Sequence, residues 1–413
     1  MRSPLFATSG LLLAGGLALC AQSAPTTHPV ALRSARLLTR TSQPLVTPGL
    51  VVVDNGRITQ VGGTAPPGAT LVDLGGTTLM AGLVDAHSHL TLDVLLGNEG
   101  GQVAAPPAEL ALRAARHAAI DVRSGVTTMR VLSEPDFIDV AYRKIFNAGD
   151  LPAPRVIIAT RAIAATNGHG VTSVRADGVD DVRHITRVNL RGGADWIKLY
   201  VTGGVATPGT TPLTSYYTRA EIAAAVEEAS RLGKRVAAHA YGGQGVDDAL
   251  AAGVSSIEHG IFLTDQQFAE MARKHVWLGA TLSVFLHTPG AAENPNWPPE
   301  IRQRFVEARK AALDSLRRAK AAGVGIVLGT DAGHGLLWED AAFAVEAGVK
   351  PVDVLAMLTE NAAAMLEMTQ EIGTVEAGKL ADLIAVDGNP VEDIRALSRV
   401  RFVMRGGAIV KRD

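Results

Sequence analysis

Cysteine is almost absent from this chain of 413 residues, since Cys20 is the only one. Cys20 lies in an N-terminal segment with the features of an export signal, so we expect the mature chain to contain no thiol and no disulfide. Its stability must then come from a packed core and from any bound metal. Aromatic residues are also scarce, at 4% of the chain, while alanine, glycine and valine are frequent, as is typical of tightly packed α/β proteins.

Blocks of like charge are missing as well. The chain has 39 basic and 41 acidic residues, spread without clustering. This near-neutral balance gives no electrostatic footprint for nucleic acid, so we expect no nucleic-acid partner.

The N-terminus has the three parts of a secretory signal peptide. Arg2 supplies a positive charge, residues 10–19 form a short apolar run, and Ala21-Gln22-Ser23 offers a cleavage site. The run is shorter than the roughly 20 residues of a membrane span, so no stable membrane insertion is expected after cleavage. A buried first helix is the structural alternative.

Lipoprotein anchoring at Cys20 is not expected, because Leu19 stands where a small residue is usual. We therefore predict a signal peptide over residues 1–23 and a protein that is periplasmic or secreted.

Short runs of β-type residues occur near both ends. Leu50 to Val53 are followed by a turn at Asp54-Asn55-Gly56, and similar runs return at 381–386, 402–405 and 408–410. This arrangement predicts a small β-sandwich domain assembled from residues 24–80 and 370–413.

The middle of the chain, residues 81–369, alternates apolar strand candidates with helical patterns, which is typical of a parallel α/β protein. The predicted helices include 107–123, 219–232 and 301–322. There are eight strand candidates: 82–88, 125–132, 154–163, 194–202, 235–241, 255–261, 277–284 and 325–332. Eight such units over about 290 residues favour a closed (β/α)8 TIM barrel over an open sheet. Two long loops, 203–218 and 285–300, follow strands and should lie over the barrel mouth.

Polar residues gather at the ends of these strands. His87 and His89 are two residues apart at the end of the first strand, so they face the same way, about 7 Å apart along it. The other candidates are Lys198, His239, His259 and Asp331, each at another strand end. A core histidine or a snorkelling lysine would explain any one of them. Their convergence on one face by chance is much harder to explain, so the set predicts a metal site.

Rival catalytic motifs are absent from the sequence. There is no HExxH, no GxSxG elbow and no GxxxxGK[ST] phosphate loop. The glycine-rich turn 242–245 follows a strand of the predicted metal site, so we interpret it as a loop.

The order of these residues resembles the binuclear metal-dependent amidohydrolase superfamily, in its imidazolonepropionase-related and prolidase-like (Xaa-Pro dipeptidase-like) branch. The resemblance covers nearly all of the mature chain, and Ala81 and Arg130-Val131 depart from its usual pattern without touching a ligand. The stretches that carry it are AGLVDAHSHL, GVTT, GADWIKLYVTGG, VAAHAYG, GVSSIEHG, GTDAG and GTVEAGKLADLIAVDGNP.

The resemblance implies a centre of two divalent ions, with zinc the expected metal. His87 and His89 would bind one ion, and His239 and His259 the other. Lys198, carboxylated by carbon dioxide, would bridge them. A carbamate can bridge two cations, whereas an ordinary lysine would be repelled by them.

The resemblance also implies the mechanism. Asp331 would contact the first ion and move the proton of a metal-bridging hydroxide to the leaving amine, acting as base and then acid.

His169 would contact the substrate carbonyl, although a solvent-exposed loop histidine is the alternative. Tyr241 could donate to the oxyanion or simply pack in the barrel. Arg130 is a candidate for binding a substrate carboxylate, with structural pairing as the alternative. No role is assigned to His287 or His334 near the mouth.

The function expected is a peptidase-like amidohydrolase that releases the C-terminal amino acid from dipeptides or N-acyl amino acids. One alternative is hydrolysis of a cyclic amide, lactone or organophosphate ester at the same centre. The other is a non-catalytic binding protein on this scaffold, against which the complete ligand set argues. A homo-oligomer is compatible with the sequence, and the loops 203–218 and 285–300 should determine specificity.

Overall fold

The computed structural model describes residues 28–413. The predicted signal peptide and Cys20 lie outside this range. None of the helices in the described part of the chain combines the length and apolar composition of a membrane span.

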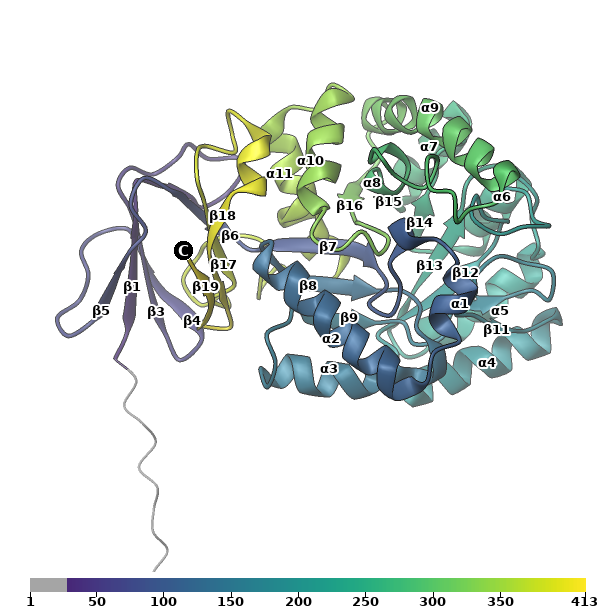
Figure 1. The fold of residues 1–413 in the computed structure, drawn as a ribbon, viewed down its shortest axis with the longest axis horizontal. Helices are drawn as coiled ribbons and strands as arrows, with labels where there is room; N and C mark the ends of the chain where they lie inside the picture. Colours follow the sequence, from purple (N-terminus) through teal and green to yellow (C-terminus); the bar gives the residue numbers. More distant parts are fainter. Residues whose placement is uncertain (1–27) are drawn as a thin grey trace, which may run out of the picture.

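The central part of the fold is made of parallel strands in two sheets, ordered β7-β8-β9 and β11-β10-β12-β13-β14-β15-β16 (Figure 1). The strands are β7 (Leu83–Ser88), β8 (Val126–Val131), β9 (Arg155–Ile158), β10 (Ile163–Ala164), β11 (Val174–Arg175), β12 (Trp196–Tyr200), β13 (Arg235–Ala240), β14 (Ser256–His259), β15 (Trp277–Ala280) and β16 (Ile326–Leu328). The predicted α/β class with a parallel sheet is confirmed.

Two backbone hydrogen bonds connect the two parallel sheets. Asp195, just before β12, donates a backbone hydrogen bond of 2.8 Å to Ile158 at the end of β9. Asp331, three residues beyond β16, donates one of the same length to His87 in β7. Each of these is an isolated hydrogen bond near the ends of the strands. No ladder of paired residues links β9 to β12 or β16 to β7. The closed ladder of the predicted barrel is therefore interrupted at two places in the described chain.

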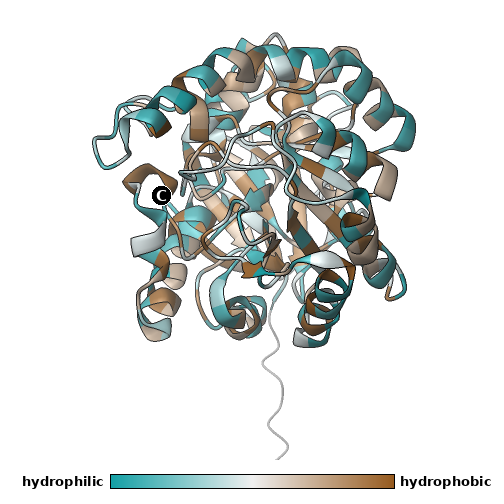
Figure 2. Cartoon of the chain, turned by 90° about the vertical axis from the view of Figure 1, so that its right-hand side faces the viewer, coloured by the Kyte–Doolittle hydropathy of each residue, from teal (hydrophilic) through white to brown (hydrophobic). Residues whose placement is uncertain are grey.

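Helices surround the parallel strands, with many hydrophilic residues on their outer sides (Figures 1 and 2). They are α1 (Glu99–Val103), α2 (Pro107–Arg123), α3 (Ile138–Ala148), α4 (Gly178–Gly192), α5 (Arg219–Ser230), α6 (Gln244–Ala252), α7 (Asp265–Lys274), α8 (Ser283–Leu286), α9 (Pro299–Ala321), α10 (Leu337–Glu346), α11 (Pro351–Leu358) and α12 (Glu360–Met365); the 3₁₀ helices are η1 (Val94–Leu96), η2 (Pro135–Phe137) and η3 (Ile394–Ser398).

Local sequence explains where several of these helices begin. Pro107 occupies the first turn of α2, where a missing N–H costs nothing. Thr218 and Glu221 form a capping box at the start of α5, and Thr264 and Gln267 form another at α7. The three predicted helices are confirmed as α2, α5 and α9, with ends that differ by no more than two residues.

Two strand candidates are partly wrong. The predicted strand 154–163 is divided into β9 and β10, which are separated by residues 159–162. The predicted strand 277–284 is also too long, because β15 ends at Ala280 and the chain turns into α8 at Ser283. The backbone N–H of Ser283 donates to the buried carboxylate of Asp340 at 2.9 Å, which anchors the start of this helix. The apolar run continues through the turn because α8 is buried too.

Strands from both ends of the chain form two further sheets, ordered β4-β3-β1-β5 and β19-β18-β17-β6-β2. They are β1 (Val30–Ser34), β2 (Arg36–Leu38), β3 (Gly49–Asp54), β4 (Arg57–Val61), β5 (Thr70–Asp73), β6 (Thr78–Ala81), β17 (Leu383–Val386), β18 (Val400–Arg405) and β19 (Ala408–Arg412). In Figure 1 they lie beside the parallel strands. One hydrophobic cluster takes residues from both sheets, including Leu32, Val51, Val72, Leu79, Leu383 and Phe402.

Candidate active site

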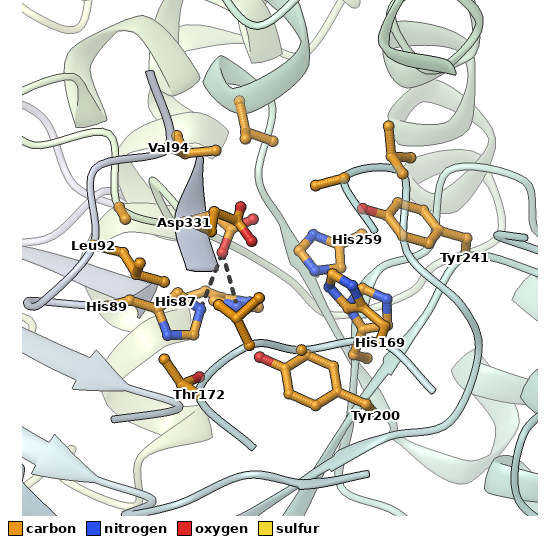
Figure 3. A pocket seen from close by; sticks show the side chains of 18 of the residues that line it. His87, His89, Leu92, Val94, His169, Thr172, Tyr200, Tyr241, His259 and Asp331 are labelled. Carbon is orange, nitrogen blue, oxygen red and sulfur yellow. Dashed lines mark ion pairs between the residues drawn. The ribbon is translucent and has the colours of Figure 1, made fainter. Parts of the chain in front are cut away.

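The predicted ligands meet in one cavity at the carboxyl ends of the parallel strands. The cavity has a volume of about 50 Å³, and all six predicted ligand residues line it: His87, His89, Lys198, His239, His259 and Asp331. They come from β7 and the residue that follows it, from β12, β13 and β14, and from the turn after β16, and several point toward one another in Figure 3. The sequence prediction of convergence therefore matches the geometry.

His87, His89 and Asp331 form the tightest group. The Oδ1 atom of Asp331 lies 3.4 Å from Nε2 of His87 and 3.2 Å from Nε2 of His89, as the dashed lines in Figure 3 show. One ligand atom from each of the three residues lies within 4.8 Å of the others, so the group could hold a metal ion. Both imidazoles are buried, and the carboxylate is only 20% exposed.

Neighbouring acceptors fix the orientation of these two imidazoles. Nδ1 of His87 donates to Oε2 of Glu258 at 2.8 Å, and Nδ1 of His89 donates to the carbonyl oxygen of Ser133 at 3.0 Å. Each ring therefore carries a proton on Nδ1 and turns its Nε2 toward the cavity. Such outer partners orient metal-binding histidines in general.

Glu258 is fully buried and paired. Arg130 donates to both of its carboxylate oxygens, at 2.9 and 3.0 Å. Burial acts to raise the pKa of Glu258, but Arg130 and the hydrogen bond from His87 outweigh it and hold the pKa well below its usual range. The carboxylate thus stays charged and keeps His87 in place.

Lys198 lies beside this group on β12. Its side chain is fully buried, and its Nζ is 3.3 Å from Nε2 of His87. Burial lowers the pKa of Lys198 to about 8, although Glu258 and Asp331 partly oppose the shift.

His239 and His259 form the opposite side of the cavity. Their ring centroids are 4.7 Å apart, and that of His259 is 5.0 Å from His87. His239 donates from Nε2 to the carbonyl oxygen of Gly203 at 3.3 Å, and Nδ1 of His259 pairs with the hydroxyl of Thr281 at 2.8 Å. These two histidines lie outside the tight group of three.

The backbone around the ligands is unusual. Asp331, Ala332 and His259 have φ values of 50°, 71° and 72°, in the left-handed region that L-residues other than glycine rarely adopt. A Cβ at Gly329 would approach the backbone nitrogen of His87 to 2.5 Å, so only glycine lets the last strand pass this close to β7. These features place Asp331 directly above the two histidines.

The remaining polar wall contains His169, Tyr200 and Tyr241. The His169 ring lies 4.4 Å from that of His239, and its Nδ1 pairs with the hydroxyl of Thr207 in the loop 203–218. Burial lowers the pKa of His169 to about 3 and raises the pKa of both tyrosines well above their usual value. His169 and Tyr241 thus lie where the sequence predicts, next to the ligands.

Arg130 is not where a substrate-binding residue should be. Its side chain is fully buried and does not line the cavity. Its nitrogens donate to Glu258, to the hydroxyl of Ser256 and to the carbonyl oxygen of Ala86. The candidate role in carboxylate binding is corrected to the structural pairing given as its alternative.

His287 and His334 also lie outside the cavity wall in the described chain. His287 pairs with Glu339 at 2.7 Å. His334 bridges α2 and the loop after β7, because Nδ1 is 2.9 Å from a carboxylate oxygen of Asp121 and Nε2 donates to the carbonyl oxygen of Leu92 at 2.8 Å. Both histidines therefore make structural contacts outside the cavity.

Three residues near the site were missed from the sequence: Glu258, Tyr200 and Glu99. Glu258 and Tyr200 flank recognised ligand positions, His259 and Lys198, so their closeness to the site was a usable signal. Glu99 lines the cavity from α1, and no pattern in the sequence pointed to it.

The donor set fits divalent metal ions. Burial lowers the pKa of His87 to about 4 and of His259 to about 3, and the pKa of His239 lies well below its usual value, so these imidazoles are neutral near pH 7, as metal binding requires. Nδ1 of His239 is buried and has no hydrogen-bond partner among residues 28–413. A metal ion is the kind of partner that such a nitrogen can take.

Comparisons with known proteins agree with this site. A model described as "Amidohydrolase family" matches residues 78–410. The chain is 31% identical over 369 residues to an ochratoxinase of Aspergillus niger, a match that covers 81% of this chain and 75% of the relative. It is 26% identical over 374 residues to an imidazolonepropionase of Salinispora tropica, covering 82% and 85% of the two chains.

Among solved structures, that of a Xaa-Pro dipeptidase with bound methionine in the active site matches with a TM-score of 0.84. The two sequences are 29% identical, and the match covers 92% of this chain and 99% of that chain. These relatives belong to the branch that the sequence motifs indicate.

Proposed function

Because this chain belongs to the amidohydrolase family and is a hydrolase that acts on amide bonds, we propose that it releases the C-terminal amino acid from dipeptides or N-acyl amino acids. The observation that carries the proposal is the meeting of four histidines, Lys198 and Asp331 in one cavity. A structural relative named as a dipeptidase supports the choice of substrate.

The residues of the cavity would hold two ions. His87, His89 and Asp331 would bind the first, as their common group suggests, and His239 and His259 the second. Lys198, carboxylated on Nζ, would lie between them, and zinc is the metal we propose from the imidazole-rich donor set. When bound, such ions polarise a carbonyl and lower the pKa of water.

The chain's own groups then complete the reaction. Oδ1 of Asp331 faces the two imidazoles, which leaves Oδ2 free to accept a proton from the attacking water and return it to the leaving amine. His169 and Tyr241 line the same cavity and would donate to the carbonyl oxygen as it becomes negative. Glu258 keeps His87 oriented throughout.

The composition of the cavity wall favours a second candidate function. No arginine, and no lysine other than Lys198, lines the cavity in the described chain. A free substrate carboxylate would therefore depend on hydroxyl and imidazole donors. Neutral substrates such as a cyclic amide, lactone or organophosphate ester need no such cation, so their hydrolysis at the same centre is the alternative.

We also propose the larger arrangement that the sequence predicts. The two parallel sheets would act as one (β/α)8 barrel over residues 81–369, and the sheets of terminal strands would form a small β-sandwich domain from 24–80 and 370–413. The backbone hydrogen bonds from Asp195 and Asp331 between the two sheets support the first proposal, and the shared hydrophobic cluster supports the second. The N-terminal segment supports export to the periplasm or medium.

The test is hydrolysis by zinc-loaded protein of dipeptides, N-acyl amino acids, their carboxyl-amidated forms, and neutral lactams, lactones and phosphotriesters. Release of amino acids from the first two classes, weakened by amidation, is the expected result. Equal rates on acid and amide forms, or activity confined to the neutral substrates, would replace the proposal by the second candidate.

A further inference from the structure

Glu99 is the one charged residue of the cavity wall that the proposed chemistry does not use. In the described chain, Glu99 and Asp331 are the only carboxylates that line the cavity. Glu99 is the first residue of α1, in the segment that follows β7, and Leu92 and Val94 from the same segment line the cavity beside it.

The segment that carries Glu99 is stabilised by hydrogen bonds within the segment and from α2. The side chain of Gln102 donates to the carbonyl oxygens of Asp93 and Gly97, and accepts from the backbone N–H of Asp93. Arg113 of α2 donates to the carbonyl oxygens of Thr91 and Gln102, at 3.2 and 2.9 Å. These contacts close the segment into a compact loop.

The same segment is also held from the other side of the mouth. Asn294 donates to the carbonyl oxygen of Leu95 at 2.6 Å, and Asn296 to that of Leu96 at 3.2 Å. Both donors lie in the loop 285–300, which the sequence identified as a specificity loop. Glu99 is therefore presented to the cavity by a segment fixed at both of its sides.

The carboxylate of Glu99 has no partner of its own. It is partly buried and accepts no hydrogen bond from residues 28–413. Burial and the negative charge of Asp331 raise the pKa of Glu99 to about 7, and His89 opposes the shift only in part. A partly buried, unpaired carboxylate is costly, and a cationic group of a ligand would remove that cost.

The wall around it is apolar. Leu92, Val94, Val284, Phe285 and Phe305 line the cavity, from three segments of the chain. A ligand that suits both features carries a positive charge close to hydrocarbon groups. An amino acid residue with a free ammonium and a hydrophobic side chain has this chemistry.

We infer that Glu99 binds a positively charged amine of the substrate, so that the preferred substrates are hydrophobic dipeptides with a free amino group rather than N-acyl amino acids. The inference rests on the proposed function, and it chooses between the two substrate classes named there. Glu99 then determines specificity at the acyl side of the scissile bond.

The first experiment compares kcat/KM for leucyl-alanine with that for its des-amino and N-acetyl analogues, using zinc-loaded protein. A further analogue carries its only amine at the end of a side chain, which separates an α-ammonium from a side-chain ammonium. We expect wild-type protein to prefer an amine-bearing substrate by at least about 10-fold, since hydrogen bonds between charged groups contribute roughly 1.5–3 kcal/mol. Glu99→Gln should abolish the preference. Glu392→Gln, the same change at an exposed position away from the cavity, should retain it.

A second measurement does not depend on hydrolysis. Calorimetry at pH 7 should show that isopentylamine binds zinc-loaded wild-type protein more tightly than isopentyl alcohol does, and that Glu99→Gln removes the difference. Failure to cleave any peptide or N-acyl amino acid would overturn the proposed function, while the calorimetric comparison would still decide the role of Glu99.

Two results would overturn the inference. One is that wild-type protein has equal kcat/KM for the amine-bearing and neutral substrates and also binds the amine and the alcohol equally tightly. The other is loss of bound zinc in Glu99→Gln, which would make Glu99 a metal ligand.

Discussion

At the scale of single residues, His87 shows how residues outside the cavity orient a metal-binding side chain. Glu258 accepts its Nδ1 proton, and Arg130 keeps Glu258 charged. Nε2 is therefore the only nitrogen left to bind an ion. Removing either partner would leave an unpaired buried charge, so the arrangement is stable only as a unit.

Lys198 gives the first prediction. We expect Lys198→Ala to lose both activity and most bound metal, because the four histidines and Asp331 would have no group between the two proposed ion positions. Lys198→Arg should not restore either property, since a guanidinium cannot become a bridging anion. Metal content per chain and hydrolysis of the best amide substrate measure the effect.

The control for Lys198 is Lys310→Ala, at an exposed position of α9. It should bind metal and turn over substrate as wild type does. A Lys198→Ala protein with two ions per chain and normal turnover would contradict the bridging role.

Asp331 gives the second prediction. Asp331→Asn keeps the size of the side chain but cannot carry a proton between water and the leaving amine. Turnover should fall by roughly 10² or more, in the range typical of lost general acid–base catalysis, while circular dichroism stays unchanged. The matched control is Asp150→Asn at an exposed position, and wild-type turnover of Asp331→Asn at saturating substrate would refute the assignment.

The sequence identified the ligands better than their partners. His87, His89 and Lys198 could be predicted because a polar side chain in a buried parallel strand is costly unless it is paired or binds a ligand. Glu258 was missed although it is next to His259, since alternation in a strand directs neighbouring side chains to opposite faces. The left-handed backbone of His259, at φ 72°, breaks that alternation, and the carboxylate of Glu258 reaches His87.

At the scale of elements, the wall of the cavity includes a segment beyond the two loops that the sequence predicts. The predicted loops 203–218 and 285–300 contribute Val205 and Phe285, and the segment after β7 contributes Leu92, Val94 and Glu99. This third segment is short and carries no catalytic motif. Its place over the mouth depends on hydrogen bonds to the loop 285–300, distant in sequence, which no local pattern reveals.

His334 joins this segment to α2 and gives the third prediction. Its side chain is only 4% exposed, and it faces Asp121 and His117 of α2, the carbonyl oxygen of Leu92, and Asp93. Burial acts to lower the pKa of His334, but Asp121 and the hydrogen bonds outweigh it and raise the pKa to about 9. Burial and the charge of His334 lower the pKa of His117 to about 4, so His117 stays neutral above pH 6.

Because the folded-state pKa of His334 is higher than the unfolded value, its contribution to stability is complete below about pH 6.5 and is lost as pH rises through 9. Wild-type protein should lose about 2 kcal/mol of unfolding free energy from this residue between pH 7 and 9.5. Urea denaturation at both values measures the loss, which His334→Gln should lack and the exposed control His184→Gln should keep. An identical pH dependence in wild type and His334→Gln would contradict the charged pairing.

At the scale of the whole molecule, the alternation of strands and helices was enough to predict a parallel α/β fold. It could not predict where the strand ladder is interrupted. The first break follows Ile158, where the backbone and carboxylate of Asp195 both bond to that residue, and the short β10 takes the place beside β12. Such breaks follow from how particular side chains pack at strand ends, and hydrophobic periodicity carries no information about them.

Metal binding should also stabilise the whole molecule, which gives the last prediction. The ligands come from segments spread from His87 to Asp331, so unfolding must break the centre and release its ions. At free zinc 1,000 times above the dissociation constant, each ion that binds the folded state alone contributes about 4 kcal/mol. With an unfolding entropy of roughly 2.1 cal/mol/K per residue, a chain of this length should melt about 5 °C lower for each ion that chelation removes. Calorimetry of zinc-loaded and chelated protein measures the difference, and added zinc should reverse it.

Lys198→Ala should show a smaller change, because its centre is incomplete. Equal melting temperatures for loaded and metal-free wild-type protein would mean that the proposed centre does not join these segments through metal.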